Sequence, residues 1–568
     1  MNEEFRKNAP EPLESISFDI QKPIETILAN RLKVVIFENN RLPLVNFRLA
    51  FFSGDAEETQ DSIGVTAALA SMLNEGTRNY TSKQLADEIE RIGAKISASS
   101  SSDFTFVSAS GLSLYTSDIL RLLAEMILLP TFPENELKLL KQNTIENLKF
   151  QRSQPDFLAN EQMARILYGD HPYSIVSPKP GDVEKITKKR LQELHDQKFI
   201  PNNAILIIVG DVDKDEILKE IENHFGEWKE GKTEILEKTE IPQRYKKSLT
   251  IVDRPGSAQS NIVLGNIAIE RTNPDYFPVL VMNQVLGAGA SSRIFMNLRE
   301  EKGYTYGAYS RMDTKKLSGE FEATAEVRTA VTGESLREFF YELNRIRDEQ
   351  VLEEELQDAK NFLAGVFPIR AETQEGLTNL IVSQKIYDLP EDYLQTYRDN
   401  INAVTVEDVQ RVAEKYIHPE TLAIVIVGDG VEILEQAKDF ANEIEIFDTD
   451  GNRKNMEDYD TEKSHETADV AGNWNLSLDF QGQLFPVTLF LEQDGENVRG
   501  KMESMLGSGE ITDGKIRGKK FSASAKTDFQ GQVLELNLSG TADGDLMNGT
   551  VNAPIIPAPV EFSGERQN

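Results

Sequence analysis

The feature that most constrains the fold is an internal repeat with a period of about 220 residues. In the first half, an amphipathic stretch over residues 186–201 leads into the apolar run 204–211, which ends in Gly-Asp. In the second half, a similar stretch over residues 404–419 leads into the run 423–429, which also ends in Gly-Asp. A further helical pattern follows each Gly-Asp, at residues 214–225 and 431–441. Because order, spacing and chemistry recur, the sequence predicts two halves of the same architecture.

Short runs rich in β-branched residues alternate with helical patterns in both halves. Six such runs predict strands, at residues 32–38, 45–52, 104–109, 249–252, 262–269 and 321–327. Three segments with helical periodicity predict helices, at residues 118–127, 136–150 and 334–347. The Pro-Glu-Asn-Glu sequence that begins at Pro133 predicts a helix start with the proline and the acidic side chains in the first turn. Each half is therefore predicted to be an α+β layer structure.

The alternation of strand and helix patterns ends at residue 447. Residues 447–468 are polar, acidic and without periodicity, which predicts a linker. The sequence Asp448-Thr-Asp-Gly resembles part of a calcium-binding loop. The other ligand positions of such a loop are missing, so we expect no metal site there.

Residues 469–568 show the alternation of β-structure. Apolar side chains recur at every second position, at Trp474, Leu476, Leu478, Phe480, Val487, Leu489 and Leu491. Asp-Gly pairs at 494–495, 513–514 and 543–544 predict turns. We expect a small all-β barrel or sandwich of about eight short strands. It carries no catalytic constellation, which favours a structural or docking role, with ligand binding as the alternative.

Length and charge exclude several classes of partner. A chain of 568 residues is too long for one core. Its net charge of -33 would repel nucleic acids and anionic lipid surfaces, so we expect neither as a partner. The absence of cysteine excludes disulfides, thiolate metal sites and thiol nucleophiles.

The N-terminal residues 1–23 contain no apolar secretion segment, and no run is long enough to span a membrane. We therefore expect a cytoplasmic protein as the sequence stands, or a periplasmic one if a signal peptide has been removed.

Residues 64–77 read GVTAALASMLNEGT and are followed by a Thr-Ser pair that predicts a helix start at Ser82. This stretch resembles the metal motif of the pitrilysin/insulinase peptidase family, whose zinc-binding members read G-x-x-H-x-x-E-H-M-L-x-x-G-T. The two histidines and the catalytic glutamate of that motif correspond here to Ala67, Ala70 and Ser71. Methyl groups and a hydroxyl cannot bind zinc or act as a general base near neutral pH. The resemblance therefore implies a chain that binds no metal or other cofactor.

A metal site elsewhere is not expected either. In the family a third ligand is a glutamate about 75 residues further on, and Glu146 lies at that distance from Ser71. Without the other ligands, Glu146 is expected to be a glutamate on a helix surface. The five histidines are scattered, with no two at helical spacing, at positions His171, His195, His224, His418 and His465. The sequence around His171 also resembles the family, where that residue is structural.

The second half resembles the family segment that carries an Arg/Tyr pair seven residues apart. Residues 286–306 read LGAGASSRIFMNLREEKGYTY, which places the pair at Arg299 and Tyr306. A guanidinium and a phenol are good donors to a peptide carbonyl oxygen, and Gly303 can end a helix between them. The alternative is that Arg299 only closes a helix C-terminus and Tyr306 is an interior strand residue. The Gly-Ala-Gly-Ala run from Gly287 lacks the pattern of a phosphate loop and predicts a turn before a helix.

The resemblance covers about residues 25–445 and implies a clamshell of two homologous α+β domains. The expected boundaries are an N-terminal tail (1–20), two peptidase-like domains (21–247 and 248–446), the acidic linker (447–468) and the β domain (469–568).

Some bacterial and mitochondrial members of the family, such as the processing peptidases, are two-chain complexes with one zinc-less subunit. By that resemblance, this chain would bind and orient a peptide or unfolded protein for a homologous partner that carries zinc, and would be inactive alone. The alternative is a non-enzymatic peptide-binding or scaffold protein. An independent peptidase using another nucleophile is not expected, because no serine or threonine lies beside a plausible histidine base in the sequence.

Overall fold

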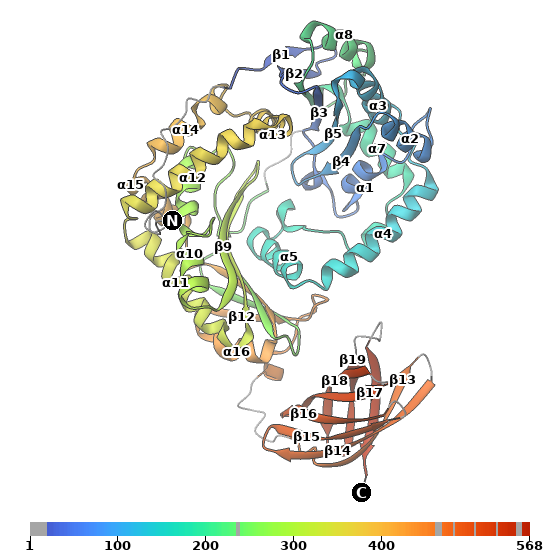
Figure 1. Ribbon diagram of the computed structural model, residues 1–568, viewed down its shortest axis with the longest axis vertical. Helices are drawn as coiled ribbons and strands as arrows, with labels where there is room; N and C mark the ends of the chain where they lie inside the picture. The colour runs from blue at the N-terminus through green and yellow to red at the C-terminus, as the bar shows by residue number, and fades with distance from the viewer. Residues whose placement is uncertain are drawn as a thin grey trace, which may run out of the picture. The chain divides into compact units, whose positions relative to one another are not determined.

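The chain forms two compact units, residues Met1–Lys454 and Asn455–Asn568, and each is described here by itself. The computed structural model in Figure 1 describes residues 20–233, 239–459, 468–480, 483–504, 507–529, 532–552 and 559–567. The first unit combines helices and strands and the second contains a closed β-barrel, which confirms the predicted fold class. No helix in the described ranges has the length and apolar character needed to cross a membrane.

The first half of the large unit is a six-stranded sheet with helices. The strand order is β1-β2-β6-β3-β5-β4. The strands are β1 (Ile24–Ile27), β2 (Lys33–Glu38), β3 (Leu44–Phe51), β4 (Lys95–Ser100), β5 (Thr105–Leu112) and β6 (Ala204–Gly210). The helices are α1 (Val65–Met72), α2 (Ser82–Arg91), α3 (Thr116–Leu128), α4 (Glu134–Arg152), α5 (Pro155–Tyr168), α6 (Pro180–Glu184), α7 (Lys188–Lys198) and α8 (Lys214–Phe225). Every residue of the inner strand β6 is buried, as its unbroken apolar run predicts.

Local signals explain where these helices begin. At the start of α2, Thr81 and Gln84 form a capping box, in which each side chain accepts a hydrogen bond from the other residue's backbone N–H. The predicted start of α2 at Ser82 is therefore confirmed. Helix α4 begins at Glu134 instead of Pro133, because Pro133 is extended and lies at the capping position. The proline is thus outside the first turn in which we expected it.

The second half repeats this arrangement. Its strand order is β12-β7-β11-β8-β10-β9, with β11 at the position of β6. The strands are β7 (Ser248–Asp253), β8 (Gln259–Ile267), β9 (Thr305–Thr314), β10 (Gly319–Arg328), β11 (Ala423–Gly428) and β12 (Glu443–Phe447). The helices are α9 (Tyr276–Leu286), α10 (Arg293–Phe295), α11 (Thr332–Asp348), α12 (Glu353–Glu372), α13 (Gln374–Ile386), α14 (Tyr393–Ala403), α15 (Val406–Tyr416) and α16 (Gly430–Ala437). A π-helical segment, Met296–Glu301, follows α10 directly. The predicted repeat is confirmed.

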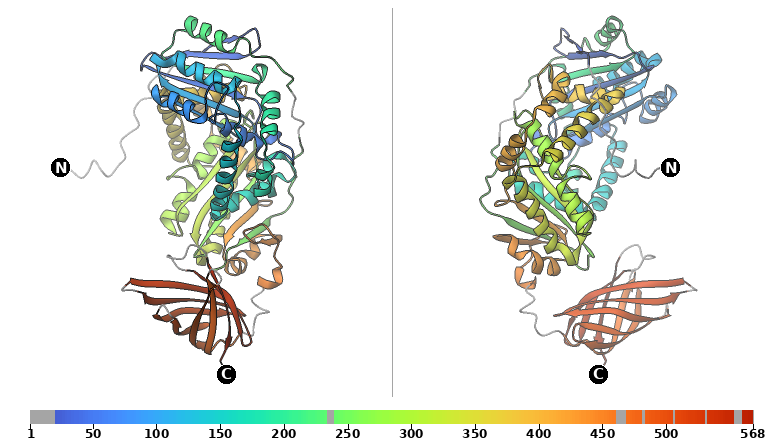
Figure 2. Two further views of the ribbon diagram at one scale, coloured as in Figure 1. Left: turned by 90° about the vertical axis from the view of Figure 1, so that its right-hand side faces the viewer. Right: turned by 60° about the vertical axis from the view of Figure 1, so that its left-hand side comes forward.

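The two halves exchange one helix each, as Figures 1 and 2 show for α5 and α13. Helix α5 of the first half packs on β8 and β11 of the second sheet. Its Leu158 and Met163 lie in one apolar cluster with Val263 and Val425 of those strands. In return, α13 of the second half packs on β3 and β6 of the first sheet. Each sheet is therefore covered partly by a helix that belongs to the other half.

A polar network also crosses between the halves. Tyr173 Oη donates to Asp103 at 2.5 Å, and Asp103 accepts the backbone N–H of Lys316 at 2.9 Å. Tyr168 donates to Glu320, which forms an ion pair with Lys315 at 2.8 Å. Because every member of this network has a hydrogen-bond partner, the halves are joined by polar as well as apolar contacts.

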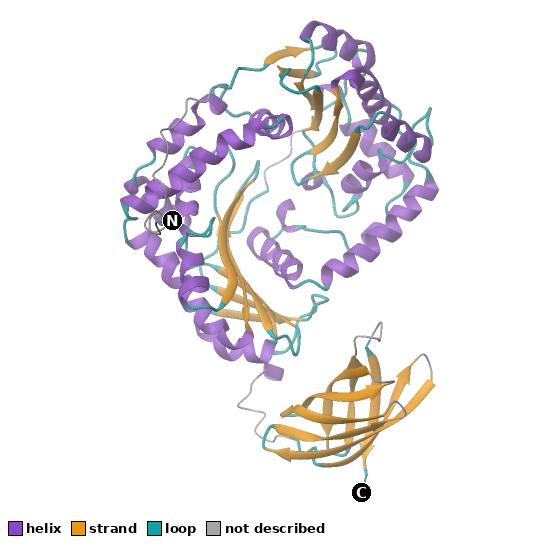
Figure 3. Ribbon diagram, viewed as in Figure 1, coloured by secondary structure: helices purple, strands orange, loops and turns teal. Residues whose placement is uncertain are grey.

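The small unit contains a closed antiparallel barrel of eight strands, in sequence order (Figure 3). The strands are β13 (Gly472–Phe480), β14 (Gln483–Asp494), β15 (Asn497–Ser504), β16 (Gly507–Arg517), β17 (Lys520–Phe529), β18 (Gln532–Asp543), β19 (Leu546–Asn552) and β20 (Val560–Arg566). The alternating residues Trp474, Leu476, Val487, Leu489 and Leu491 are in its apolar core, as predicted. Leu478 is partly buried against it, and the side chain of Phe480 lies outside what the structure describes.

Two of the three predicted Asp-Gly turns are confirmed. Gly495 and Gly544 have φ of 61° and 59° between successive strands. The prediction at 513–514 is wrong, because this pair lies inside β16, where the pairing with β15 shifts register. A Cβ on Gly514 would lie 2.5 Å from the carbonyl oxygen of Val498. The glycine therefore serves a close approach of two strands, and the turn comes later, at Gly518.

Candidate functional site

The first candidate site is the turn of α1 that corresponds to the metal motif. Ala67 and Ser71 lie on the exposed face of the helix, and Ala70 is 1% exposed. The Ser71 hydroxyl donates to the backbone carbonyl of Ala67 at 3.0 Å. Glu58 positions the helix, because its two carboxylate oxygens accept the N–H groups of Gly64 and Thr66, each at 2.7 Å. The turn is thus well ordered but presents one hydroxyl and two methyl groups.

A cavity of about 500 Å³ lies beside this turn and is lined by first-half residues alone. Ala67 and Ser71 face Thr144 and Asn147 of α4 across it. Glu146 does not line the cavity. Its side chain is 70% exposed and forms an ion pair with Lys149 at 2.7 Å. The expectation of a surface glutamate is confirmed, and the α4 residue that faces the motif positions is Asn147.

The donor set around this cavity does not fit zinc, which prefers imidazole, thiolate or carboxylate ligands in a tetrahedron. Of the two acids in its lining, Glu58 is occupied by the cap of α1. Asp55 keeps one buried oxygen without a hydrogen-bond partner, and burial raises the pKa of its carboxyl. Among the residues that the structure describes, no three acidic or histidine side chains come close enough to hold a metal ion.

His171, His195 and the Asp448 loop have structural roles. His171 Nδ1 accepts the backbone N–H of Tyr173 at 3.1 Å, and His195 Nε2 lies 2.8 Å from the carbonyl oxygen of Ile127. Burial lowers the pKa of both imidazoles. The Asp448 carboxylate accepts N–H groups of Asp450 and Asn452 at 3.0 and 2.8 Å, which makes it a turn-forming group. His465 lies outside the described residues.

The second candidate site brings Arg299 and Tyr306 together. Arg299 lies in the π-helical segment, Gly303 follows with φ of 64°, and Tyr306 is the second residue of β9. The Arg299 guanidinium donates to the main-chain carbonyl of Tyr306, and its Nε lies 3.1 Å from Glu300 Oε1. The Tyr306 side chain is 88% exposed, so it is not the interior strand residue of the alternative interpretation. A partly exposed guanidinium and an exposed phenol therefore lie on either side of the turn at Gly303.

The edge of β9 near this pair is covered by the segment after α9. Ser310 N–H donates to the carbonyl of Gly287 at 2.9 Å, and the Asn283 side-chain amide donates to the Ser310 carbonyl at 3.3 Å. A Cβ on Gly287 would lie 2.4 Å from Ser310 N. Gly287 is thus a close-packing glycine in the turn between α9 and α10, as the turn prediction implied.

The corresponding edge strand of the first sheet, β4, is open. No backbone hydrogen bond joins residues 95–100 to anything but β5 in the described part of the chain. Lys95, Ser97 and Ser99 are exposed, with their side chains on one face of the strand. Only Lys95 is the kind of residue that protects natural sheet edges. The strand therefore offers a row of unpaired N–H and C=O groups.

Two family models match the chain. The model described as insulinase (peptidase family M16) matches residues 33–180, and the peptidase M16 inactive domain matches residues 185–363. Together they match most of the first half of the large unit and the second half as far as residue 363, and they do not reach the barrel.

Relatives of this chain are found in bacteria. The chain is 25% identical over 407 residues to an uncharacterized zinc protease, YmxG, of Bacillus subtilis. The aligned region covers 70% of this chain and 96% of that protein. The chain is also 25% identical over 410 residues to a protein named non-peptidase homolog YmxG of Helicobacter pylori, covering 70% of this chain and 92% of that one. The solved structure of a peptidase M16 inactive domain from Pseudomonas fluorescens superposes with a TM-score of 0.68 at 27% identity, over 72% of this chain and 98% of that one.

Proposed function

The chain belongs to the M16 (insulinase) peptidase family, and on that premise we propose that it is a zinc-less, peptide-binding subunit whose homologous partner carries the metal. The observation that carries the proposal is a contrast between the two candidate sites. The α1 turn has no side chain suited to bind zinc, whereas the partly exposed Arg299 and the exposed Tyr306 are joined by a hydrogen bond across the turn at Gly303.

The open edge of β4 supports the peptide-binding part of the proposal. An extended peptide can add to a free sheet edge through main-chain hydrogen bonds, which accept any sequence. Because β9 is covered by Gly287 and Asn283, β4 is the better of these two edges for such a peptide. A cavity of about 610 Å³ lies beside Lys95, the first residue of β4, and is also lined by Ser110 of β5 and Gln374 of α13.

The chemistry available to this chain is hydrogen-bond donation. Arg299 and Tyr306 can donate to a peptide carbonyl, orient it and stabilise the negative charge that its oxygen gains during hydrolysis. To do so, Arg299 must exchange its present acceptor, the Tyr306 carbonyl, for the substrate carbonyl. The metal-activated water would come from the partner, because no residue of the α1 turn can supply it.

A binding experiment tests the proposal. The probe is a degenerate pool of 15-residue peptides without proline, blocked at both ends and labelled with fluorescein, and Kd is measured by anisotropy. The wild-type chain should bind the pool, and Arg299→Ala should raise Kd about 10- to 100-fold, because a charged hydrogen bond is lost. Arg337→Ala, which removes an exposed guanidinium on α11, is the matched control and should leave Kd unchanged. A wild-type chain that does not bind the pool, or an Arg299→Ala variant that binds it equally well, would refute the proposal.

Activity assays test the partnership. The isolated chain should cleave no peptide and contain no stoichiometric zinc, and cleavage should appear when a zinc-carrying homologue that co-purifies with it is added. Zinc-dependent cleavage by the chain alone would contradict the assignment.

A second candidate function is a non-enzymatic peptide-binding or scaffold protein. The Helicobacter pylori relative favours it, because that protein is named a non-peptidase homolog. Peptide binding without cleavage in the presence of every co-purifying chain would select this function.

A further inference from the structure

The turn that carries Arg299 is held from beneath by a buried polar network. The π-helical segment Met296–Glu301 places Asn297 on the inner side, 6% exposed, and Arg299 on the outer side. An i to i+5 hydrogen bond runs from Lys302 N–H to the Asn297 carbonyl at 3.0 Å. Short π-helical turns are uncommon and occur mainly where a side chain has to be re-aimed for function.

Two carboxylates of α11 converge on the Asn297 amide. Its Nδ2 donates to Glu338 Oε2 at 3.0 Å and to Glu342 Oε1 at 2.8 Å. Glu342 is 3% exposed, and Arg345 lies 3.5 Å from its other oxygen. Lys302, just past the turn, forms an ion pair with Glu338 at 3.1 Å. The amide is therefore the group that links both acids to the turn.

The start of the segment is fixed in a second place. Arg293 binds Glu355 of α12 with two parallel hydrogen bonds of 2.7 and 2.8 Å, and is 7% exposed. Because the segment is fixed before, within and after the π-helical turn, the backbone of Arg299 has little freedom to rotate.

This network lowers the free energy of unfolding compared with an apolar contact at the same place. The buried carboxylate of Glu342 costs desolvation energy, and Asn297 adds a second buried polar group beside it, which an apolar residue at position 297 would avoid. The oxygen of the Asn297 amide is buried without a hydrogen-bond partner. An arrangement that leaves a buried acceptor unsatisfied is a poor way to gain stability, which points to a role in geometry.

We propose that Asn297 is a positioning residue, which fixes the π-helical turn through Glu338 and Glu342 so that Arg299 points at a bound peptide carbonyl. The inference rests on the proposed function, because it assigns Asn297 an effect that passes through Arg299. Without the amide, the two hydrogen bonds from position 297 to α11 are lost and the turn can relax to an ordinary helix. Arg299 would then move by up to about 100° around the helix axis for each residue of register lost.

The test is a double-mutant cycle with the same peptide pool as probe. Asn297→Asp keeps the shape of the side chain but adds a third negative charge to the network. We expect it to raise Kd about 10-fold in the Arg299 background and less than about 2-fold in the Arg299→Ala background. Combining Asn297→Asp with Glu342→Gln exchanges the amide and the carboxylate at constant net charge, and it should restore Kd to within about 3-fold of wild type.

The matched control is Asn266→Asp, which alters another buried asparagine of the same half. Its amide donates to the carbonyls of Ile267 and Tyr416, away from Arg299. It should lower the melting temperature and leave Kd unchanged. If Asn297→Asp does not fold, Asn297→Ser replaces it in the cycle, because it removes the amide without adding charge.

The outcomes separate the two claims. Equal fold losses in the Arg299 and Arg299→Ala backgrounds, or no loss in either, would overturn the role of Asn297. An Arg299→Ala variant that binds like wild type would instead overturn the proposed function itself.

Discussion

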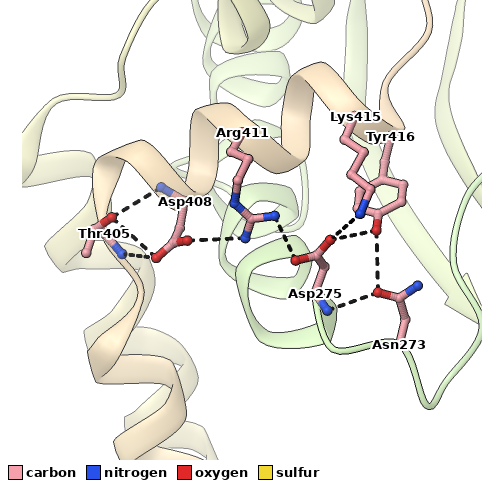
Figure 4. Close-up of polar contacts among 7 residues, drawn as sticks. All are labelled: Asn273, Asp275, Thr405, Asp408, Arg411, Lys415 and Tyr416. Atoms are coloured by element: carbon pink, nitrogen blue, oxygen red, sulfur yellow. Dashed lines mark hydrogen bonds and ion pairs between the residues drawn. The ribbon is translucent and has the colours of Figure 1, made fainter.

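Replacing Asp275 with asparagine is expected to destabilise the large unit in a pH-dependent way. Asp275 lies just before α9 and accepts hydrogen bonds from three residues of α15 (Figure 4). The distances are 2.8 Å to Arg411, 2.9 Å to Lys415 and 2.7 Å to Tyr416. Asparagine has one acceptor oxygen in place of two, and its amide would point at donors. The substitution therefore breaks most of the polar contacts between Asp275 and α15.

The size of the stability loss can be worked out from the pKa of Asp275. Burial alone would raise this pKa, but the hydrogen bonds from Lys415, Tyr416 and Arg411 outweigh it and lower the value from 3.8 to about 2. Taken in full, this shift corresponds to about 2 kcal/mol of stability. Because Lys415 and Arg411 are about half exposed, solvent screening reduces the electrostatic part to about 1 kcal/mol.

The lowered pKa of Asp275 decides how its contribution to stability changes with pH. The carboxylate is favoured in the folded state, so its contribution is complete above the unfolded-state pKa of about 4 and is lost as the pH falls from 4 to 2. Urea unfolding of wild type and Asp275→Asn should therefore show a midpoint difference that is constant from pH 7 to 5 and shrinks below pH 4. Asp408→Asn, which removes the more exposed carboxylate that pairs with Arg411, is the control and should change the midpoint little. A difference of the same size at pH 7 and pH 3 would refute the electrostatic argument.

Two further substitutions test the packing. Gly287→Ala should lower the melting temperature and loosen β9, because its Cβ would lie 2.4 Å from Ser310 N; Gly289→Ala, which meets only the end of the Gln284 side chain, should be tolerated. Met163→Ala should cost about 2 to 5 kcal/mol of unfolding free energy, since Met163 is fully buried between the halves; Leu139→Ala, 51% exposed on α4, should cost little. A neutral Gly287→Ala, or equal effects of Met163→Ala and Leu139→Ala, would contradict these arguments.

Sequence patterns identified the inner strands of both sheets and missed the outer ones. All four strands that were not predicted, β1, β4, β9 and β12, lie at sheet edges. An inner strand is buried on both faces and needs an unbroken apolar run, as in β6. An edge strand such as β4, which reads KISASS, is half exposed and carries no such signal. The edges that matter most for the proposed function were therefore the least visible in the sequence.

The candidate site was predictable in its chemistry and less so in its geometry. The motif positions Ala67, Ala70 and Ser71 follow from the resemblance of residues 64–77 to the metal motif of the family. Spacing could not decide which α4 residue faces them, because one position along a helix turns the side chain by about 100°. Glu146 and Asn147 consequently point in different directions, and only Asn147 lines the cavity. The role of Asn297 depends on the π-helical segment, which no local signal in the sequence distinguishes from an ordinary helix.

The exchange of α5 and α13 has a consequence for synthesis on the ribosome. The first sheet cannot receive its last covering helix until residue 386 has been made, and α5 must wait for β11 at residues 423–428. During translation, the face of the first sheet that α13 covers is therefore open to solvent from Gly210 until Ile386 has been made, and the face of α5 that packs on β11 is open from Tyr168 until Gly428. Apolar surface exposed in this way makes a nascent chain prone to aggregate, the condition in which chaperones act.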